Sequence, residues 1–390
     1  MNNTPFITSK LPNVGTTIFS KMSALATQHQ AINLSQGFPN FGCDEHLLDL
    51  LNHYLRKGYN QYAPMIGVAE LRQAISAMLT TQDAANYNPD TEITITSGAT
   101  EALFAAIAAT VRPHDEVIVL EPCYDSYVPA IELNGGIAVP VPLDAPSYAP
   151  NWAKIAAAIS PQTRMMIINS PHNPSGYVWK KSDIEELTKL IAHKNIFILS
   201  DEVYEFMCFD GSPHHSIASV PALREKAFIV SSFGKTFHTT GWKVGYCLAP
   251  APLSTEFRKV HQYLTFATHT PTQYALAEYL KTKPEKYQQL AAFYQQKRDT
   301  FLKYLQGSAF TFVPTQGTYF QLLGYENISQ LSDTVLAEKM VEDIGVASIP
   351  ISVFYKENAP QHKLLRFCFA KDDETLRLAA EKLKAGFPNK

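Results

Sequence analysis

The sequence is poor in cysteine and contains no long hydrophobic run. Its 390 residues include five cysteines, which stand singly and without the CxxC spacing of common metal sites. This pattern argues against a disulfide framework and a zinc site, so we expect no metal. No uninterrupted apolar stretch reaches the roughly 18 residues of a membrane helix. The N-terminus, MNNTPFITSK, also lacks the charged-then-apolar pattern of a secretory signal. We therefore expect a cytoplasmic protein without a membrane partner.

Basic patches, internal repeats and low-complexity linkers are also absent from the sequence. The formal net charge is -3, and 46% of the residues are hydrophobic, which is ordinary for a globular protein. Because a nucleic-acid backbone is bound through clustered lysines and arginines, we expect no nucleic-acid partner.

The order of β-rich and helical patterns predicts an α/β fold with two domains. Predicted strands lie at residues 92–98, 115–122, 163–171, 195–204, 226–234 and 245–251, with further strands at 317–323 and 364–370 beyond a helical region. The first group are nearly continuous apolar runs, as in a mostly parallel sheet that is sandwiched by helices. The last two predict a smaller α+β domain. We assign residues 1–45 to an N-terminal arm and part of the small domain, 46–285 to the large domain and 286–390 to the small domain.

Residues that could bind a ligand follow the first predicted strands. Ligands of parallel sheets gather beyond the carboxyl ends of the strands. SGAT (97–100) opens an Ala-rich helix there, and a helix N-terminus can bind an anion such as phosphate. Tyr124, in EPCYDSY, could lie against a planar ligand or fill the core. Asn173, in NSPHNPSG, could donate an amide or belong to a structural turn.

The later strand ends carry charge. SDEVY (200–204) places Asp201 at the end of one strand, with Tyr204 close behind it. SSFGKTFHTTGWKVGY supplies Ser232 and two lysines, Lys235 and Lys243, in a stretch that should otherwise be buried. Buried ammonium groups need compensation, which a phosphate and a carbonyl would provide. Pyridoxal 5'-phosphate needs a phosphate cradle, an aromatic neighbour, a carboxylate, hydrogen-bond donors and a lysine amine, so these strand ends together predict this cofactor.

With these motifs in place, the sequence resembles the class I aminotransferases of pyridoxal-phosphate fold type I. Within them it is similar to the branch of kynurenine, glutamine and methionine aminotransferases. The motifs LSQGFPNF, NQYAPMIGVAELRQAI, SGATEAL, EPCYDSY, NSPHNPSG, SDEVYE, SSFGKTFHTTGWKVGY, HQYLTFATHTPTQ and LLRFCFA occur in the family's order and span most of the chain.

The resemblance implies a role for each residue that matches a family motif. It implies Lys235, Asp201 and Tyr204 as catalytic, with Lys235 first the covalent anchor and then the general base. The cofactor-binding residues that it implies are Lys235, Gly98, Ala99, Thr100, Tyr124, Asn173, Asp201, Tyr204, Ser232, Lys243 and Tyr62. The substrate-binding residues are Arg366, Gly37, Asn173, Phe19 and Phe266. Tyr62 would reach the neighbouring subunit, so a homodimer with composite active sites is implied.

Substrate choice rests on fewer residues. No second arginine is identifiable for a far carboxylate, which argues against a dedicated aspartate aminotransferase. An aromatic wall of Phe19, Tyr62, Tyr124 and Phe266 would suit methionine, aromatic amino acids, kynurenine or glutamine, although each ring could equally belong to the core. We predict a transaminase that moves the amino group of methionine, aromatic or related L-amino acids to a 2-oxo acid.

Three alternatives stay open. A carbon–sulfur β-lyase shares the fold and cofactor, and no residue excludes it. A cofactor-sensing regulator would carry an N-terminal DNA-binding domain, for which about thirty residues before LSQGFP leave little room. An inactive paralogue would be expected to lose its lysine or arginine first.

Overall fold

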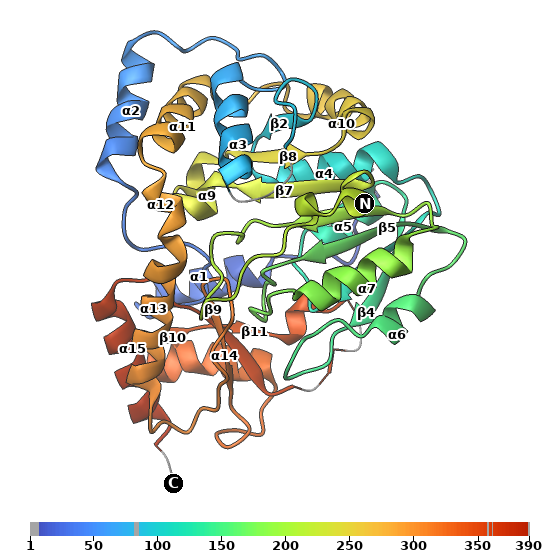
Figure 1. The fold of residues 1–390 in the computed structure, drawn as a ribbon. Helices are drawn as coiled ribbons and strands as arrows, with labels where there is room; N and C mark the ends of the chain where they lie inside the picture. The colour runs from blue at the N-terminus through green and yellow to red at the C-terminus, as the bar shows by residue number, and fades with distance from the viewer. Residues whose placement is uncertain (1–7, 82–85, 357–358, 361, 389–390) are drawn as a thin grey trace, which may run out of the picture.

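The structure is a computed structural model that describes residues 8–81, 86–356, 359–360 and 362–388. It has a large lobe built on one mixed sheet and a smaller lobe packed below it (Figure 1). Among the described residues, no helix is both long and apolar enough to span a membrane.

The central sheet has seven strands. Their order is β2 (Ile93–Thr96), β8 (Gly245–Leu248), β7 (Ala227–Ser232), β6 (Phe197–Asp201), β5 (Thr163–Asn169), β3 (Glu116–Glu121) and β4 (Ile137–Pro142). Only β8 is antiparallel to its neighbours. The predicted mostly parallel sheet is therefore confirmed, and the carboxyl ends of β3, β5, β6 and β7 meet at one edge.

Helices cover both faces of this sheet because successive side chains of each strand point to opposite faces. On β3, Val117 and Val119 share a core with α4 (Ala99–Thr110), α5 (Tyr127–Leu133) and α10 (Ala251–Leu264). Ile118 and Leu120 belong to the other core. The helices of that core include α2 (Glu45–Arg56), α3 (Ala69–Thr81), α6 (Trp152–Ala157), α7 (Lys181–Ile191), α8 (Pro221–Arg224) and α11 (Thr270–Thr282).

Strand β4 is absent from the sequence prediction. Its sequence, IAVPVP, contains Pro140 and Pro142, which have no N–H to donate to a neighbouring strand. The strand is tolerated because it lies at the edge of the sheet and pairs with β3 alone.

The small lobe contains an antiparallel sheet in the order β11 (Ile349–Pro350), β12 (Leu364–Cys368) and β9 (Phe320–Gly324). The helices α13 (Leu290–Leu305), α14 (Asp333–Lys339) and α15 (Asp373–Gly386) pack around it, and α12 (Glu285–Gln288) precedes them. The predicted small sheet is confirmed. Its two-residue strand β11 was not predicted, because two residues are too few to form a recognisable apolar pattern.

The N-terminal segment joins this lobe rather than the large one. Met22 and Ala26 of α1 (Ile18–Gln28) share a core with Leu376 and Leu383 of α15. Strand β1 (Ile32–Asn33) pairs in parallel with β10 (Val346–Ala347). We retain the domain limits given above as a proposal, which the core shared by α1 and α15 supports.

Candidate active site

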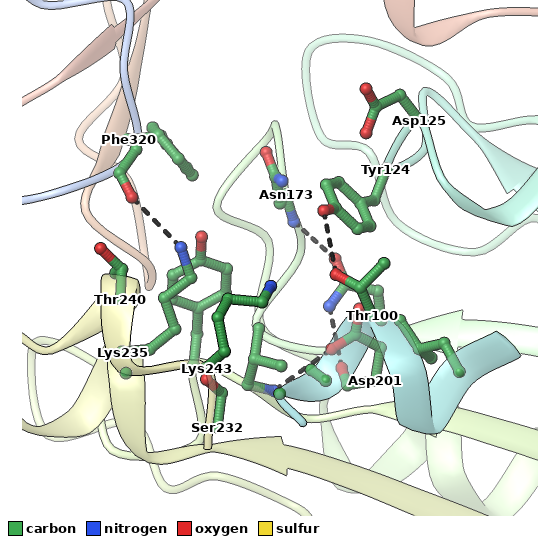
Figure 2. A pocket seen from close by; sticks show the side chains of 18 of the residues that line it. Thr100, Tyr124, Asp125, Asn173, Asp201, Ser232, Lys235, Thr240, Lys243 and Phe320 are labelled. Atoms are coloured by element: carbon green, nitrogen blue, oxygen red, sulfur yellow. Dashed lines mark hydrogen bonds between the residues drawn. The ribbon is translucent and has the colours of Figure 1, made fainter. Parts of the chain in front are cut away.

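A cavity of about 290 Å³ lies where the carboxyl ends of the large-lobe strands face the small lobe. Figure 2 shows Ser232, Lys235 and Lys243 on one side of it, with Thr100 and Asp201 on the other. Of the predicted site residues, those that line it are Phe19, Gly37, Gly98, Ala99, Thr100, Tyr124, Asn173, Asp201, Tyr204, Ser232, Lys235, Lys243 and Arg366. Segments far apart in the sequence thus converge on one cavity.

Asp201 is the last residue of β6 and is almost completely buried. Its carboxylate accepts a hydrogen bond from the Tyr127 hydroxyl at 2.6 Å and another from the Val203 N–H at 3.3 Å. Burial raises the pKa of Asp201 to about 6, although these hydrogen bonds and the positive charge of Lys235 oppose the rise. The carboxylate can therefore be ionised at neutral pH inside the protein.

Lys235 lies in α9 (Phe233–Thr236), directly after β7. Its Nζ donates hydrogen bonds to the Tyr319 hydroxyl at 2.8 Å and to the Gly37 carbonyl at 3.1 Å. Burial lowers the pKa of Lys235 to about 8, and the positive charges of Arg366 and Lys243 act in the same direction. An amine with this pKa is partly neutral near physiological pH, as a nucleophile or a general base must be.

The N-terminus of α4 forms a positively charged corner of the cavity. Gly98 caps this helix with a φ of 81°, and a Cβ at this position would lie 3.3 Å from Cε and 3.4 Å from Nζ of Lys243. Lys243 itself has a left-handed backbone, with a φ of 55°, and makes no ion pair within the described ranges. Because the first N–H groups of a helix lack intrahelical partners, this corner suits an anion such as phosphate.

Arg366 is a buried cation on β12 that has no carboxylate partner among the described residues. Its Nη1 donates to Asn173 Oδ1 at 2.8 Å, and its Nη2 donates to the Ser35 carbonyl at 3.2 Å. The guanidinium also lies 3.8 Å from the centre of the Phe320 ring. Burial lowers the pKa of Arg366 to about 10, and its Nε is buried without a hydrogen-bond partner in this part of the chain. A buried guanidinium that makes no salt bridge of its own is suited to a carboxylate ligand.

Aromatic rings complete the cavity wall. Tyr124 packs edge-on against Tyr127, and its hydroxyl lies 3.5 Å from Thr100 Oγ1. Tyr204 packs edge-on against Tyr319 and Phe320, and the centre of its ring lies 5.2 Å and 6.0 Å from theirs.

The NSPHNPSG loop is held by a 2.7 Å hydrogen bond from the Asn173 N–H to the Asn169 side chain.

Two predicted residues lie outside the cavity of the single chain. Tyr62 is 85% exposed and Phe266 is 37% exposed, and their rings pack edge-to-face 5.3 Å apart on the surface. Their predicted contact with an active site requires a second subunit and stays a prediction.

Sequence reasoning missed several residues that contact the predicted ones. Tyr127, which contacts Asp201, lies three residues beyond Tyr124 in the same motif. A second tyrosine so close to a strand end could have been predicted as a site residue. Tyr319 gave no such signal because its contacts with Lys235 and Gly37 join distant parts of the chain. Asp125 and Phe320, which line the cavity, were also missed. Asp125 directly follows Tyr124 in the same motif, so its position was a local signal, whereas Phe320 comes from a distant strand.

Comparisons with known proteins identify the family. The model of aminotransferase class I and II matches residues 29–383. The chain is 52% identical to the methionine aminotransferase of Escherichia coli, over 98% of this chain and 100% of that one. It is 35% identical to the kynurenine–oxoglutarate transaminase of Dictyostelium discoideum, with 95% and 94% covered.

Solved structures give the same result. An Escherichia coli structure described as having a methionine aminotransferase function superposes with a TM-score of 0.95, at 52% identity and 98% and 100% coverage. The N-succinyldiaminopimelate aminotransferase of Mycobacterium tuberculosis superposes with a TM-score of 0.94, at 35% identity and 97% and 99% coverage. The predicted transaminase activity is confirmed, and these relatives favour it over a β-lyase. The chain belongs to the aminotransferase class I and II family.

Proposed function

We propose that this aminotransferase binds pyridoxal 5'-phosphate in the cavity and transfers the amino group of methionine or an aromatic L-amino acid to a 2-oxo acid. One observation carries the proposal. The buried guanidinium of Arg366, which makes no salt bridge with a carboxylate among the described residues, faces the same cavity as the Lys235 amine and the Asp201 carboxylate.

The donor set of the cavity fits this cofactor, which the aminotransferase class I and II family uses. Lys243 and the α4 N-terminus supply positive charge for the phosphate, and the absence of a Cβ at Gly98 leaves space beside them. The residues that would hold the cofactor are Lys235, Gly98, Ala99, Thr100, Tyr124, Asn173, Asp201, Tyr204, Ser232 and Lys243, with Tyr62 contributed by a partner subunit. Arg366 and Gly37 would hold the substrate carboxylate.

When bound, pyridoxal 5'-phosphate supplies an electron-withdrawing ring that stabilises negative charge at the substrate Cα. Asp201, as an ionised carboxylate, would hold a proton on the ring nitrogen. Arg366 would fix the substrate carboxylate and so orient the Cα–H bond. The neutral amine of Lys235 would take the proton from Cα and return it to the product.

The aromatic wall and the relatives support the substrate preference. Phe19, Tyr124 and Phe320 line the cavity, and none of them carries a charge. Such a wall favours uncharged side chains of the size of methionine or phenylalanine. The 52% identity to a methionine aminotransferase supports the same choice.

The exposed pair of Tyr62 and Phe266 supports a homodimer, because two large aromatic rings on a surface gain stability when a second subunit covers them. Mixing Lys235→Ala and Tyr62→Ala subunits tests this arrangement. A mixed dimer has one site with both native residues, so activity should return on mixing. A mixture that stays inactive would show that Tyr62 serves its own subunit.

A cytoplasmic location is supported by the cysteines, all of which are free. Fractionation of cells that express the protein would test it, and recovery outside the cytoplasm would contradict it.

Absorption spectroscopy tests the proposed function. The purified protein, loaded with pyridoxal 5'-phosphate, should show a visible band that methionine or phenylalanine bleaches in the absence of a 2-oxo acid. Adding a 2-oxo acid should restore the band. Lys235→Ala should lack it, whereas Lys194→Ala, a change at an exposed lysine, should keep it. No visible band in the native protein would contradict the cofactor assignment, and a band that only other amino acids bleach would contradict the substrate assignment.

A further inference from the structure

Tyr319 is a fully buried residue just before β9, and it contacts two predicted site residues at once. Its hydroxyl donates a hydrogen bond to the Gly37 carbonyl and accepts one from Lys235 Nζ at 2.8 Å. Lys235 Nζ also donates to the Gly37 carbonyl at 3.1 Å. The three groups therefore form a closed triangle of hydrogen bonds.

The directions of these hydrogen bonds orient the lysine amine. A phenol has one proton, and Tyr319 uses it on the Gly37 carbonyl, so its oxygen can only accept from Lys235. A neutral primary amine has two N–H bonds and one lone pair. Because the two N–H bonds point to the Tyr319 and Gly37 oxygens, the lone pair is the part of the nitrogen that stays free.

The backbone before Tyr319 is strained in a way that fixes this ring. Thr318 has a φ of 66°, a left-handed conformation that is unfavourable for a β-branched residue. It is completely buried, and its N–H donates to the Met207 carbonyl at 3.0 Å. Its hydroxyl accepts a hydrogen bond from the Phe320 N–H at 3.1 Å. These contacts hold the turn that places Tyr319 against Lys235 and Gly37.

Packing leaves the Tyr319 ring little freedom. It packs against Tyr204 and Tyr294, with ring centres 5.2 Å and 5.6 Å away. A Cβ at Gly37 would lie 2.8 Å from the Phe320 ring and 3.6 Å from the Tyr319 ring. Glycine at this position therefore allows the carbonyl of residue 37 to reach the phenol.

We infer that Tyr319 is a positioning residue, which together with the Gly37 carbonyl holds the free amine of Lys235 with its lone pair directed into the cavity. The inference rests on the proposed function, in which this amine first captures the cofactor and later moves the substrate proton. It also links the amine to the segment of Gly37, the residue that we propose binds the substrate carboxylate.

Tyr294 provides a matched control for this inference. It is as buried as Tyr319 and packs against it, but its hydroxyl has no hydrogen-bond partner among the described residues. Tyr319→Phe and Tyr294→Phe each remove one buried hydroxyl and keep the ring. Only the first removes a contact with Lys235.

The test measures how fast cofactor-free protein captures pyridoxal 5'-phosphate, as a function of pH. Capture joins the amine nitrogen to the aldehyde carbon with loss of one water molecule, and the visible band reports it. In Tyr319→Phe, the rate on the high-pH plateau should fall about tenfold, because the lone pair is no longer held in place. The pH midpoint of the rate should also move down, because an acceptor that favours the ammonium form is lost. Tyr294→Phe should match the native protein in both.

The outcomes separate the inference from the proposed function. If the native protein captures cofactor at Lys235 but Tyr319→Phe behaves like Tyr294→Phe, the inference is wrong and the proposed function stands. A slower rate in both variants without a shift of the midpoint would indicate a packing effect and would also overturn the inference. If Lys235→Ala captures the cofactor as the native protein does, the proposed function itself fails.

Discussion

The phenol of Tyr127 donates a hydrogen bond of 2.6 Å to the carboxylate of Asp201 at the buried end of β6. This contact joins the α5 side of the sheet to the residue that we propose faces the cofactor ring. It stabilises a negative charge that burial alone would disfavour.

Tyr127→Phe should shift the pH dependence of activity. A hydrogen bond to a charged group contributes about 1.5–3 kcal/mol, so its loss should raise the pKa of Asp201 by about 1–2 units. Activity requires the ionised carboxylate, and the acid limb of kcat/KM should move to higher pH by a similar amount. A pH profile with methionine measures this shift, with Tyr294→Phe as the control. An unchanged acid limb would show that Tyr127 does not tune Asp201.

Asp201→Asn should stabilise the cofactor-free protein while it abolishes activity. The folded state raises the pKa of Asp201 from 3.8 to about 6, so between these pH values it holds a proton that the unfolded chain has lost. The resulting stabilisation is complete below the unfolded pKa and is lost as the pH rises through 6. The neutral amide avoids this loss and should increase the free energy of unfolding at pH 8 by about 2–3 kcal/mol. Urea unfolding at pH 8 and pH 4 tests the prediction, since the gain should vanish at pH 4.

Gly98→Ala should weaken cofactor binding more than it weakens the fold. The new Cβ would crowd Lys243 beside the α4 N-terminus, and the φ of 81° disfavours any side chain. Gly58 is the control, because its φ is 93° and a Cβ there would meet nothing within 4 Å. Both variants should lose about 1 kcal/mol of stability. Only Gly98→Ala should raise the dissociation constant of pyridoxal 5'-phosphate, by about tenfold or more in a spectroscopic titration. Equal effects on binding would exclude a phosphate site at this corner.

Arg366→Lys should raise KM for the amino acid about 100-fold, because it removes the planar fork and the stacking on Phe320. Arg298 of α13 is an equally buried arginine, and it pairs with Asp210 at 2.6 Å. Arg298→Lys should lower the melting temperature without changing KM. Steady-state kinetics and thermal unfolding of both variants test this prediction. A normal KM in Arg366→Lys would show that Arg366 does not bind the substrate.

Sequence patterns predicted the parts of the fold whose signal is local. The strand that ends at Asp201 and the strand that precedes Lys235 are apolar runs long enough to recognise, and motif order placed their end residues in one cavity. Strand β4 was not predicted, because Pro140 and Pro142 are unfavourable in any strand that is not at an edge. Edge position is a property of the whole sheet, so no local pattern reports it.

The contacts between the site residues were harder to predict than which residues belong to the site. Arg366 was expected to bind a carboxylate, but its unpaired Nε and its stacking on Phe320 depend on how β12 and β9 pair in the small lobe. Tyr319 reaches Lys235 from a turn that Thr318 holds in a left-handed conformation. A preference for this conformation at a threonine is invisible in the sequence, because the residue type argues against it.

The position of α1 in the small lobe has a consequence for synthesis on the ribosome. Met22 and Ala26 are made about 350 residues before Leu376 and Leu383, their core partners on α15. At typical elongation rates this delay lasts roughly 20 to 70 seconds. During that time the apolar face of α1 lacks the part of its core that α15 supplies. A chaperone that covers α1 until α15 has been made should therefore raise the yield of native enzyme.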